Sequence, residues 1–285
     1  MRKRPATLRR TVEAIAEAAG VTALAVAYHD YQTRTEWSYH GERWFHAAST
    51  IKLPVLLGIF GEVAAGRLRL DSRVHVRNRF LSVVEGRPSY RVGSGRDADS
   101  SVHAAIGRTL PVQELAQPMI ATSSNLATNL LVDLVGVERI RETLAELRLD
   151  EGLDFRRGVE DERAFAAGIN NRVTAEGLLR ALRVVAEERA FSAELSEQML
   201  EILHAQEFRS GIPAGLPAEA KVAHKTGEIS TVAHDAGIVY LPEREPYALV
   251  VLTEFKARDG GGKDTIAKVS RAIYRHLTTG EGENE

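Results

Sequence analysis

The sequence of 285 residues contains no cysteine. Disulfide bonds, a thiolate nucleophile and cysteine-ligated metal sites are therefore excluded, and cysteine usage gives no information about the redox compartment. Lysine is scarce as well, with seven lysines beside 30 arginines. A lysine that falls within a motif therefore carries more weight here than it would in a lysine-rich chain.

Long hydrophobic runs and a strong net charge are also missing. No stretch approaches the roughly 18 uninterrupted apolar residues of a membrane-spanning helix. The start, Met1–Arg4, is basic, but Glu13 and Glu17 interrupt the segment behind it, so the apolar core of a signal peptide does not follow. From these residues we expect a cytoplasmic protein, or a periplasmic or secreted one if a leader has been removed. The net charge of −2 favours neither nucleic acid nor an acidic membrane as a partner.

The residue patterns that are present predict an α/β (α+β) protein of two lobes. Short apolar β-type runs lie near both ends of the chain, and helical periodicity fills the middle. Consecutive hairpin-like strands favour an antiparallel sheet. We therefore expect a five-stranded antiparallel sheet covered by the terminal helices (residues 1–50 and 213–285), an inserted all-helical lobe (51–212), and an active site at their interface. The expected strands are 21–29, 34–40, 220–227, 231–241 and 247–255, and the expected helical regions are 6–19, 50–65, 111–149, 174–208 and 262–278.

A first motif, Ser49-Thr50-Ile51-Lys52, opens the helical region near residue 50. A lysine three residues after a serine lies on the same helix face. Serine is a weak nucleophile and needs a base, and lysine can serve once desolvation or a neighbouring cation lowers its pKa. Taken alone, the same residues fit a helix-capping serine and a surface lysine.

Two further motifs follow. Ser123-Ser124-Asn125 could relay a proton and bind a substrate amide, or simply cap a helix. Lys225-Thr226-Gly227 lies on a β-type run, where the lysine and threonine could hold a substrate carboxylate and the glycine would admit substrate close to the backbone. Alternatively, Lys225 is a lysine on an edge strand, where its charge prevents edge-to-edge aggregation.

The three motifs together are informative although each is weak alone. From this composition, chance alone predicts about 0.4 occurrences of S-x-x-K, about 0.3 of S-x-N and about 0.03 of K-T-G, a product of roughly 0.004. The same triple set characterises class A β-lactamases and penicillin-binding proteins. With the motifs in this order, the chain resembles class A β-lactamases and their penicillin-recognising relatives over about residues 20–278.

The resemblance implies a role for each matching position. Ser49 would be acylated, Lys52 would be its base, and Ser123 would pass a proton to the departing ring nitrogen. Asn125 would hold the side-chain amide of the substrate. In the third motif, Lys225 and Thr226 would hold the carboxylate and Gly227 would allow close approach. The backbone N–H groups of Ser49 and Glu228 would form the oxyanion hole.

Two departures from the family pattern bear on function. Ser124 stands where these enzymes usually carry aspartate. The family's E-x-x-L-N loop, whose glutamate activates the deacylating water, is absent from residues 155–175, and Gly158 falls at the glutamate position. Glu160 is the nearest substitute, ahead of Asp161 and Glu162. If all three are solvated loop charges, the acyl-enzyme would persist.

These observations predict a serine hydrolase that opens β-lactam amides through an acyl-enzyme on Ser49, acts on a small molecule and is monomeric. A D-alanyl-D-alanine peptidase or esterase with slow deacylation is the alternative, and a non-catalytic binder of cell-wall peptides is a second one. No metal or organic cofactor is expected, because the nine histidines form no metal-binding motif. Adjacent His234 and Asp235 would face opposite sides of a strand and cannot orient one another.

Overall fold

The computed structural model describes residues 4–256 and 262–278, and its centre is a five-stranded antiparallel sheet in the order β10-β11-β12-β1-β2. The predicted fold class is confirmed. Residues 1–3, which include the basic Arg2 and Lys3, and the tail 279–285 lie outside the described residues. The strands of the sheet are β1 (Ala23–Asp30), β2 (Thr35–Tyr39), β10 (Lys221–Ile229), β11 (Val232–Tyr240) and β12 (Tyr247–Glu254).

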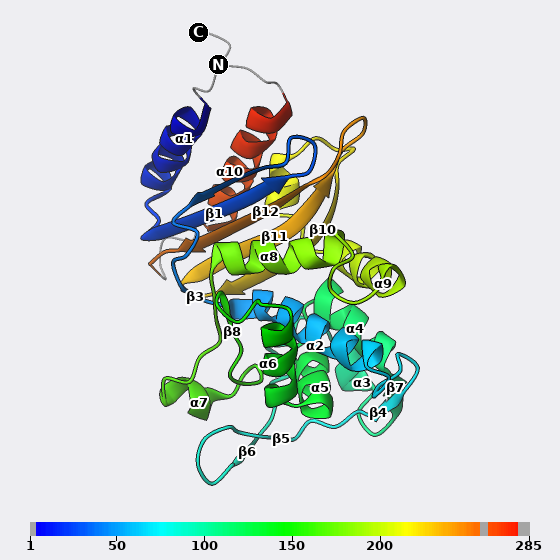
Figure 1. Ribbon diagram of the computed structural model, residues 1–285. Helices are drawn as coiled ribbons and strands as arrows, with labels where there is room; N and C mark the ends of the chain where they lie inside the picture. The colour runs from blue at the N-terminus through cyan, green and yellow to red at the C-terminus, as the bar shows by residue number, and fades with distance from the viewer. Residues whose placement is uncertain (1–3, 257–261, 279–285) are drawn as a thin grey trace.

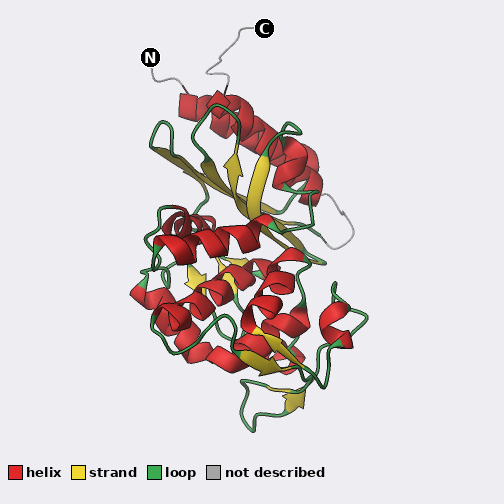
Figure 2. Ribbon diagram, turned by 90° about the vertical axis from the view of Figure 1, so that its right-hand side faces the viewer, coloured by secondary structure: helices red, strands yellow, loops and turns green. Residues whose placement is uncertain are grey.

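The sheet is a middle layer with helices on both faces (Figures 1 and 2), and apolar side chains pack on each face. The terminal helices α1 (Arg4–Ala19) and α10 (Gly262–Thr278) pack on one face, and α8 (Ala175–Ala186) packs on the other. Every residue of β1 is buried as a result. Burial on both faces explains why β1 and β12 read as nearly continuous apolar runs rather than as alternating patterns.

The helical lobe is built around α2 (Lys52–Ala64), whose residues 52–61 are all buried. Such an apolar helix is stable only when neighbours cover its whole circumference. Two glycines let α6 approach closely, since a Cβ at Gly58 would lie 2.7 Å from Ile140 and one at Gly61 would lie 2.8 Å from Thr143. The surrounding helices are α4 (Val112–Ala121), α5 (Asn125–Val135), α6 (Val137–Glu146) and α9 (Ala193–His204).

The structure differs from the sequence prediction in its short elements. Residues 174–208 form two helices, α8 and α9, because the chain turns at Glu188, whose φ is 55°. Segments outside the predicted strands, or at the ends of the predicted helical regions, contain strands and helices too short to show a readable period. These elements are β3 (Phe45–His46), β4 (Arg73–His75), β5 (Phe80–Leu81), β6 (Ser89–Tyr90), α3 (Ser101–Ala104), β7 (Thr109–Pro111), β8 (Leu153–Asp154), α7 (Glu162–Ala166), β9 (Arg172–Val173) and the 3₁₀ helix η2 (Ile212–Gly215).

The first and third motifs meet where the helical lobe touches the sheet edge. A 3₁₀ turn, η1 (Ala48–Ile51), leads into α2 and packs against β10, the edge strand. Among the described residues, no helix is long and apolar enough to span a membrane.

Candidate active site

Ser49 lies in η1, which packs against strand β10. In a 3₁₀ helix residues three apart are eclipsed, so Ser49 and Lys52 project on the same side. A Cβ added to Gly227 would lie 3.0 Å from the backbone N of Ser49 and 2.9 Å from that of Thr50. Only glycine allows this approach, so Gly227 lets the strand backbone lie against the serine turn; the close approach of substrate that the third motif predicts stays a prediction.

Lys52 is fully buried and hydrogen-bonded to the second motif. Its Nζ donates to the Ser123 carbonyl at 2.5 Å, to Ser123 Oγ at 3.0 Å and to Asn125 Oδ1 at 2.8 Å. Burial, and then the charge of Lys225, hold the pKa of Lys52 well below its ordinary value. A neutral amine has a lone pair and two N–H groups, so Lys52 has the chemistry of a general base once it is deprotonated and donates to no more than two of these three acceptors.

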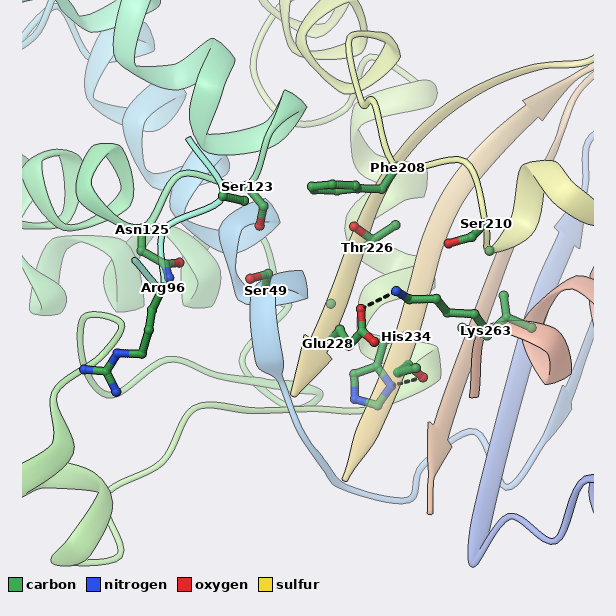
Figure 3. A pocket seen from close by; sticks show the side chains of 15 residues that line it. Ser49, Arg96, Ser123, Asn125, Phe208, Ser210, Thr226, Glu228, His234 and Lys263 are labelled. Carbon is green, nitrogen blue, oxygen red and sulfur yellow. Dashed lines mark hydrogen bonds and ion pairs between the residues drawn. The ribbon is translucent and has the colours of Figure 1, made fainter. Parts of the chain in front are cut away.

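Ser123 lies in the turn between α4 and α5 rather than on the helical stretch that the sequence predicts. Its φ of 63° places a non-glycine residue in the left-handed region, a conformation that costs energy and is common at active sites. Ser124 caps α5, its side chain accepting from Ala127 N. Asn125 is the first residue of that helix, so the helix start fixes Ser123 and Asn125 (Figure 3), whose side chains both accept from Lys52.

Lys225 is also fully buried, which excludes the alternative of an exposed lysine guarding the sheet edge. Its Nζ donates to the Thr226 carbonyl at 2.9 Å. Burial lowers the pKa of Lys225 to about 7, and the carboxylate of Asp235 offsets part of that effect. Thr226 lines the cavity beside Ser49, so the threonine of the pair faces the cavity directly.

Glu228 carries its side chain away from the sheet edge toward α10. Its Oε2 pairs with Lys263 Nζ at 2.6 Å, and the side chains of both residues are about half exposed (Figure 3). Lys263 is a cation at this cavity that sequence reasoning missed. It lies outside every motif, and only the fold brings the start of α10 to β10.

Glu160 enters the site from the long loop between β8 and β9. Its Oε1 accepts from Asn125 Nδ2 at 2.8 Å, and its Oε2 accepts from the Gly93 backbone at 3.1 Å and lies 3.7 Å from Arg96. The side chain is 13% exposed, so it is not a solvated loop charge. Asp161 instead caps α7 and bonds Ser82, whereas the side chain of Glu162 is 73% exposed.

The loop has no space for a side chain at Gly158, the position aligned with the family's glutamate. A Cβ there would lie 2.6 Å from Asn129 Oδ1 and 2.7 Å from the Tyr90 hydroxyl. Asn129 also holds Val159, the residue after Gly158. Its Oδ1 accepts from Val159 N at 2.8 Å, and its Nδ2 donates to the Val159 carbonyl at 2.9 Å. The loop neck is tied by Asn171, whose Oδ1 accepts from Arg156 N at 2.7 Å.

Two adjoining cavities meet at Ser49. One of about 260 Å³ lies on the Thr226 side, and one of about 360 Å³ lies on the Glu160 side. Neither a motif nor a period marks the additional lining residues, which come from separate segments: Arg96, Phe165, Phe208, Ser210 and His234.

The histidines near the site have structural partners. His234 Nε2 lies 2.9 Å from the His46 carbonyl, and burial lowers the pKa of His234 to about 4. Asp235 faces the opposite side from His234, as the strand alternation predicts. On that side it pairs with His224 Nδ1 at 2.8 Å.

Comparisons with known proteins agree with this geometry. The sequence profile of the "Beta-lactamase enzyme family" matches residues 7–277. The extended-spectrum beta-lactamase PER-1 of Pseudomonas aeruginosa is 24% identical over 243 residues, which cover 81% of this chain and 75% of that protein. A structure of PBP-A, at 24% identity, superposes with a TM-score of 0.80 over 94% of this chain and 95% of its own. A beta-lactamase of Sphaerobacter thermophilus, at 25% identity, gives 0.76 over 95% and 96%. The chain is a serine hydrolase and belongs to the beta-lactamase enzyme family.

Proposed function

We propose that this enzyme opens β-lactam amides by forming an acyl-enzyme on Ser49. One observation carries the proposal: a fully buried lysine follows the serine by three residues and is hydrogen-bonded to a second serine and an asparagine. A structural lysine would cost free energy in such a place, since burial disfavours its charged form. A lysine that must be neutral to accept a proton gains its function from that burial.

The proposed reaction uses each motif once. Ser49 Oγ attacks the lactam carbonyl carbon while its proton passes to Lys52 Nζ. The carbon–nitrogen bond then breaks, and the ring nitrogen takes a proton from Ser123 Oγ, which regains one from Lys52. Because β10 is an edge strand, alternate N–H groups lack a partner strand, and such donors can stabilise the oxyanion. Lys225 and Thr226 hold the substrate carboxylate.

Water must then split the Ser49 ester, and we propose Glu160 as the base that activates it. Glu160 and Ser49 line the same cavity. Through Asn125, the carboxylate of Glu160 is also connected to Lys52. The proton of the attacking water would pass to Glu160 and, as the ester bond breaks, on to the departing Ser49 Oγ, so that both side chains return to their starting protonation states.

A penicillin-binding peptidase or esterase with slow deacylation is the second candidate. It is favoured by the contacts of Glu160, since both carboxylate oxygens already accept hydrogen bonds, from Asn125 and from Gly93. It is also favoured by the likeness to PBP-A, a point mutant of which has been solved as an acyl-enzyme complex with penicillin G.

The deciding experiment is intact mass spectrometry over time after mixing with a chromogenic cephalosporin, with its absorbance followed in parallel. Steady colour with a transient adduct supports the β-lactamase. A lasting adduct without turnover supports the slow-deacylating enzyme. The absence of both colour and adduct would contradict both candidates and would leave the non-catalytic binder. Ser49→Ala must abolish the adduct, and a normally labelled variant would contradict the central proposal.

Glu160→Gln separates the two candidates within the same assay. We expect fast acylation followed by accumulation of the adduct, because the amide cannot take a proton from water. The matched control is Glu162→Gln, on the same loop, whose carboxylate pairs with Arg96 at 2.8 Å and is mostly exposed. Release at the same rate in Glu160→Gln and wild type would remove Glu160 from the reaction.

A further inference from the structure

We infer that Asp97 is a positioning residue for the proposed reaction: from the segment before α3 it holds the Ser123–Asn125 turn against Lys52. The inference rests on the proposed function. Asp97 belongs to none of the three motifs, and its neighbourhood in the sequence is a polar loop.

The carboxylate of Asp97 is fully buried at the start of α5. Its Oδ1 accepts from Asn125 N at 2.9 Å, and its Oδ2 accepts from Leu126 N at 2.9 Å. A carboxylate here satisfies two N–H groups that a helix start leaves unpaired and lies at the positive end of the helix dipole. Asp97 therefore fixes the backbone of Asn125, whose side chain bonds Lys52.

The turn that Asp97 holds is strained. Ser123 has a left-handed backbone, and its carbonyl and hydroxyl both accept from Lys52. Such a conformation persists only where surrounding contacts over-determine it. Ser124 Oγ, between the two functional residues, also lies 3.3 Å from Asp97 Oδ2. Loss of the carboxylate would free this turn to relax away from Lys52.

Capping explains why the carboxylate comes from a distant segment. The capping residue of α5 is Ser124, whose hydroxyl accepts from Ala127 N, and an aspartate there would cap the helix itself. The family pattern has aspartate at that position, and this chain does not. Asp97, 27 residues earlier, supplies the negative charge instead.

The negative charge also acts on Lys52 electrostatically. Asp97 raises the pKa of Lys52, against the larger lowering by burial and Lys225, and Glu160 acts in the same direction as Asp97. The remaining titratable partner is His103 of α3, whose Nε2 lies 3.2 Å from Asp97 Oδ2. Loss of the Asp97 charge should therefore lower the pKa of Lys52.

The test is Asp97→Asn, which keeps the shape and removes the charge. We expect acylation to slow by about 10- to 100-fold, as for other groups that orient a functional side chain. The limb of the acylation pH profile set by Lys52 should move to lower pH. The matched control is Asp99→Asn. Asp99 is a buried cap in the same segment that bonds Ser101 N and Thr122 Oγ1 and does not contact Asn125. In Asp99→Asn the limb of the acylation pH profile set by Lys52 should stay at the wild-type pH.

A second variant returns the charge to the helix cap. Asp97→Asn with Ser124→Asp should recover most of the rate and move the limb back. If Asp97→Asn fails to fold, recovery of folding and acylation in the double variant supports the inference. A wild-type rate and an unmoved limb in Asp97→Asn would overturn it, as would failure of both variants to fold.

A readout without substrate separates this inference from the proposed function. The seven lysines make an NMR titration of isotope-labelled lysine side chains tractable, with Lys52→Arg to assign the signal. A lower pKa of Lys52 in Asp97→Asn supports the positioning role even if the wild type forms no adduct. If the wild type acylates but the pKa of Lys52 and the rate are unchanged in Asp97→Asn, only the inference fails.

Discussion

Lys52 and Lys225 are both wholly buried beside the same cleft, and their charges repel. Two buried ammonium groups are costly together, so the arrangement favours one neutral and one charged lysine. In the proposed reaction Lys52, with the strongly lowered pKa, acts as the base, and Lys225, which is protonated below its pKa of about 7, is the cation that helps to keep Lys52 neutral. Sequence reasoning reached this pair because each lysine stands in a motif.

Lys52→Ala should slow acylation of Ser49 by about 10²- to 10⁴-fold, the usual contribution of a general base. Rapid-mixing mass spectrometry measures the rate directly. The control is Lys221→Ala, an exposed lysine at the start of β10. Equal rates for Lys52→Ala and wild type would show that another group takes the serine proton.

At the scale of elements, the sequence predicts the long helices and strands but not the shortest strands. Helices α1 and α10 carry a clear amphipathic period, α2 and the buried strands stand out as apolar runs, and the predicted ranges of these elements agree with the structure within a few residues. Two-residue strands such as β3 carry none. The contacts of Glu160 with Asn125 and Gly93 were equally out of reach, because they join segments 35 and 67 residues apart.

The loop between β8 and β9 also shows why Gly158 must remain glycine. Gly158→Ala would press a methyl group against Asn129 and Tyr90, and overpacking of this kind costs about 1–3 kcal/mol. We expect a lower free energy of unfolding, together with slower release from Ser49 because Glu160 would shift. Chemical denaturation gives the first quantity and adduct lifetime the second.

The control for this substitution is Gly95→Ala. A Cβ at Gly95 has no heavy atom within 4 Å and its φ is not in the left-handed region, so its stability should match that of wild type. Equal stability of Gly158→Ala and Gly95→Ala would mean that the loop yields to the methyl group at no cost.

At the scale of the whole molecule, each face of the sheet packs against a separate hydrophobic core. One apolar cluster lies between the sheet and the terminal helices, and the larger one lies between the sheet and the helical lobe. The composition of the strands predicts the burial but not the partner of each face. The division into lobes at residues 50/51 and 212/213 stays a prediction, as does the monomeric state.

Burial of lysine between the lobes should also make stability depend on pH. The pKa of Lys225 is about 7 in the folded protein, and that of an unfolded lysine is about 10.4. Between these values the unfolded chain binds a proton that the folded protein lacks, so the free energy of unfolding rises with pH. Lys52 contributes with the same sign. Burial raises the pKa of Tyr31 and Tyr247, which reverses the sign above about pH 10.

Lys225→Met removes one of these groups while filling its space. Between about pH 7 and 9.5, its free energy of unfolding should rise less steeply than that of wild type, by up to about 1.4 kcal/mol per pH unit. Denaturant titrations at several pH values measure both slopes, and Lys221→Met, on the exposed end of the same strand, should keep the wild-type slope. Parallel slopes for Lys225→Met and wild type would mean that Lys225 stays protonated throughout, and that its charge, rather than its neutral form, faces Lys52 at every pH where the enzyme works.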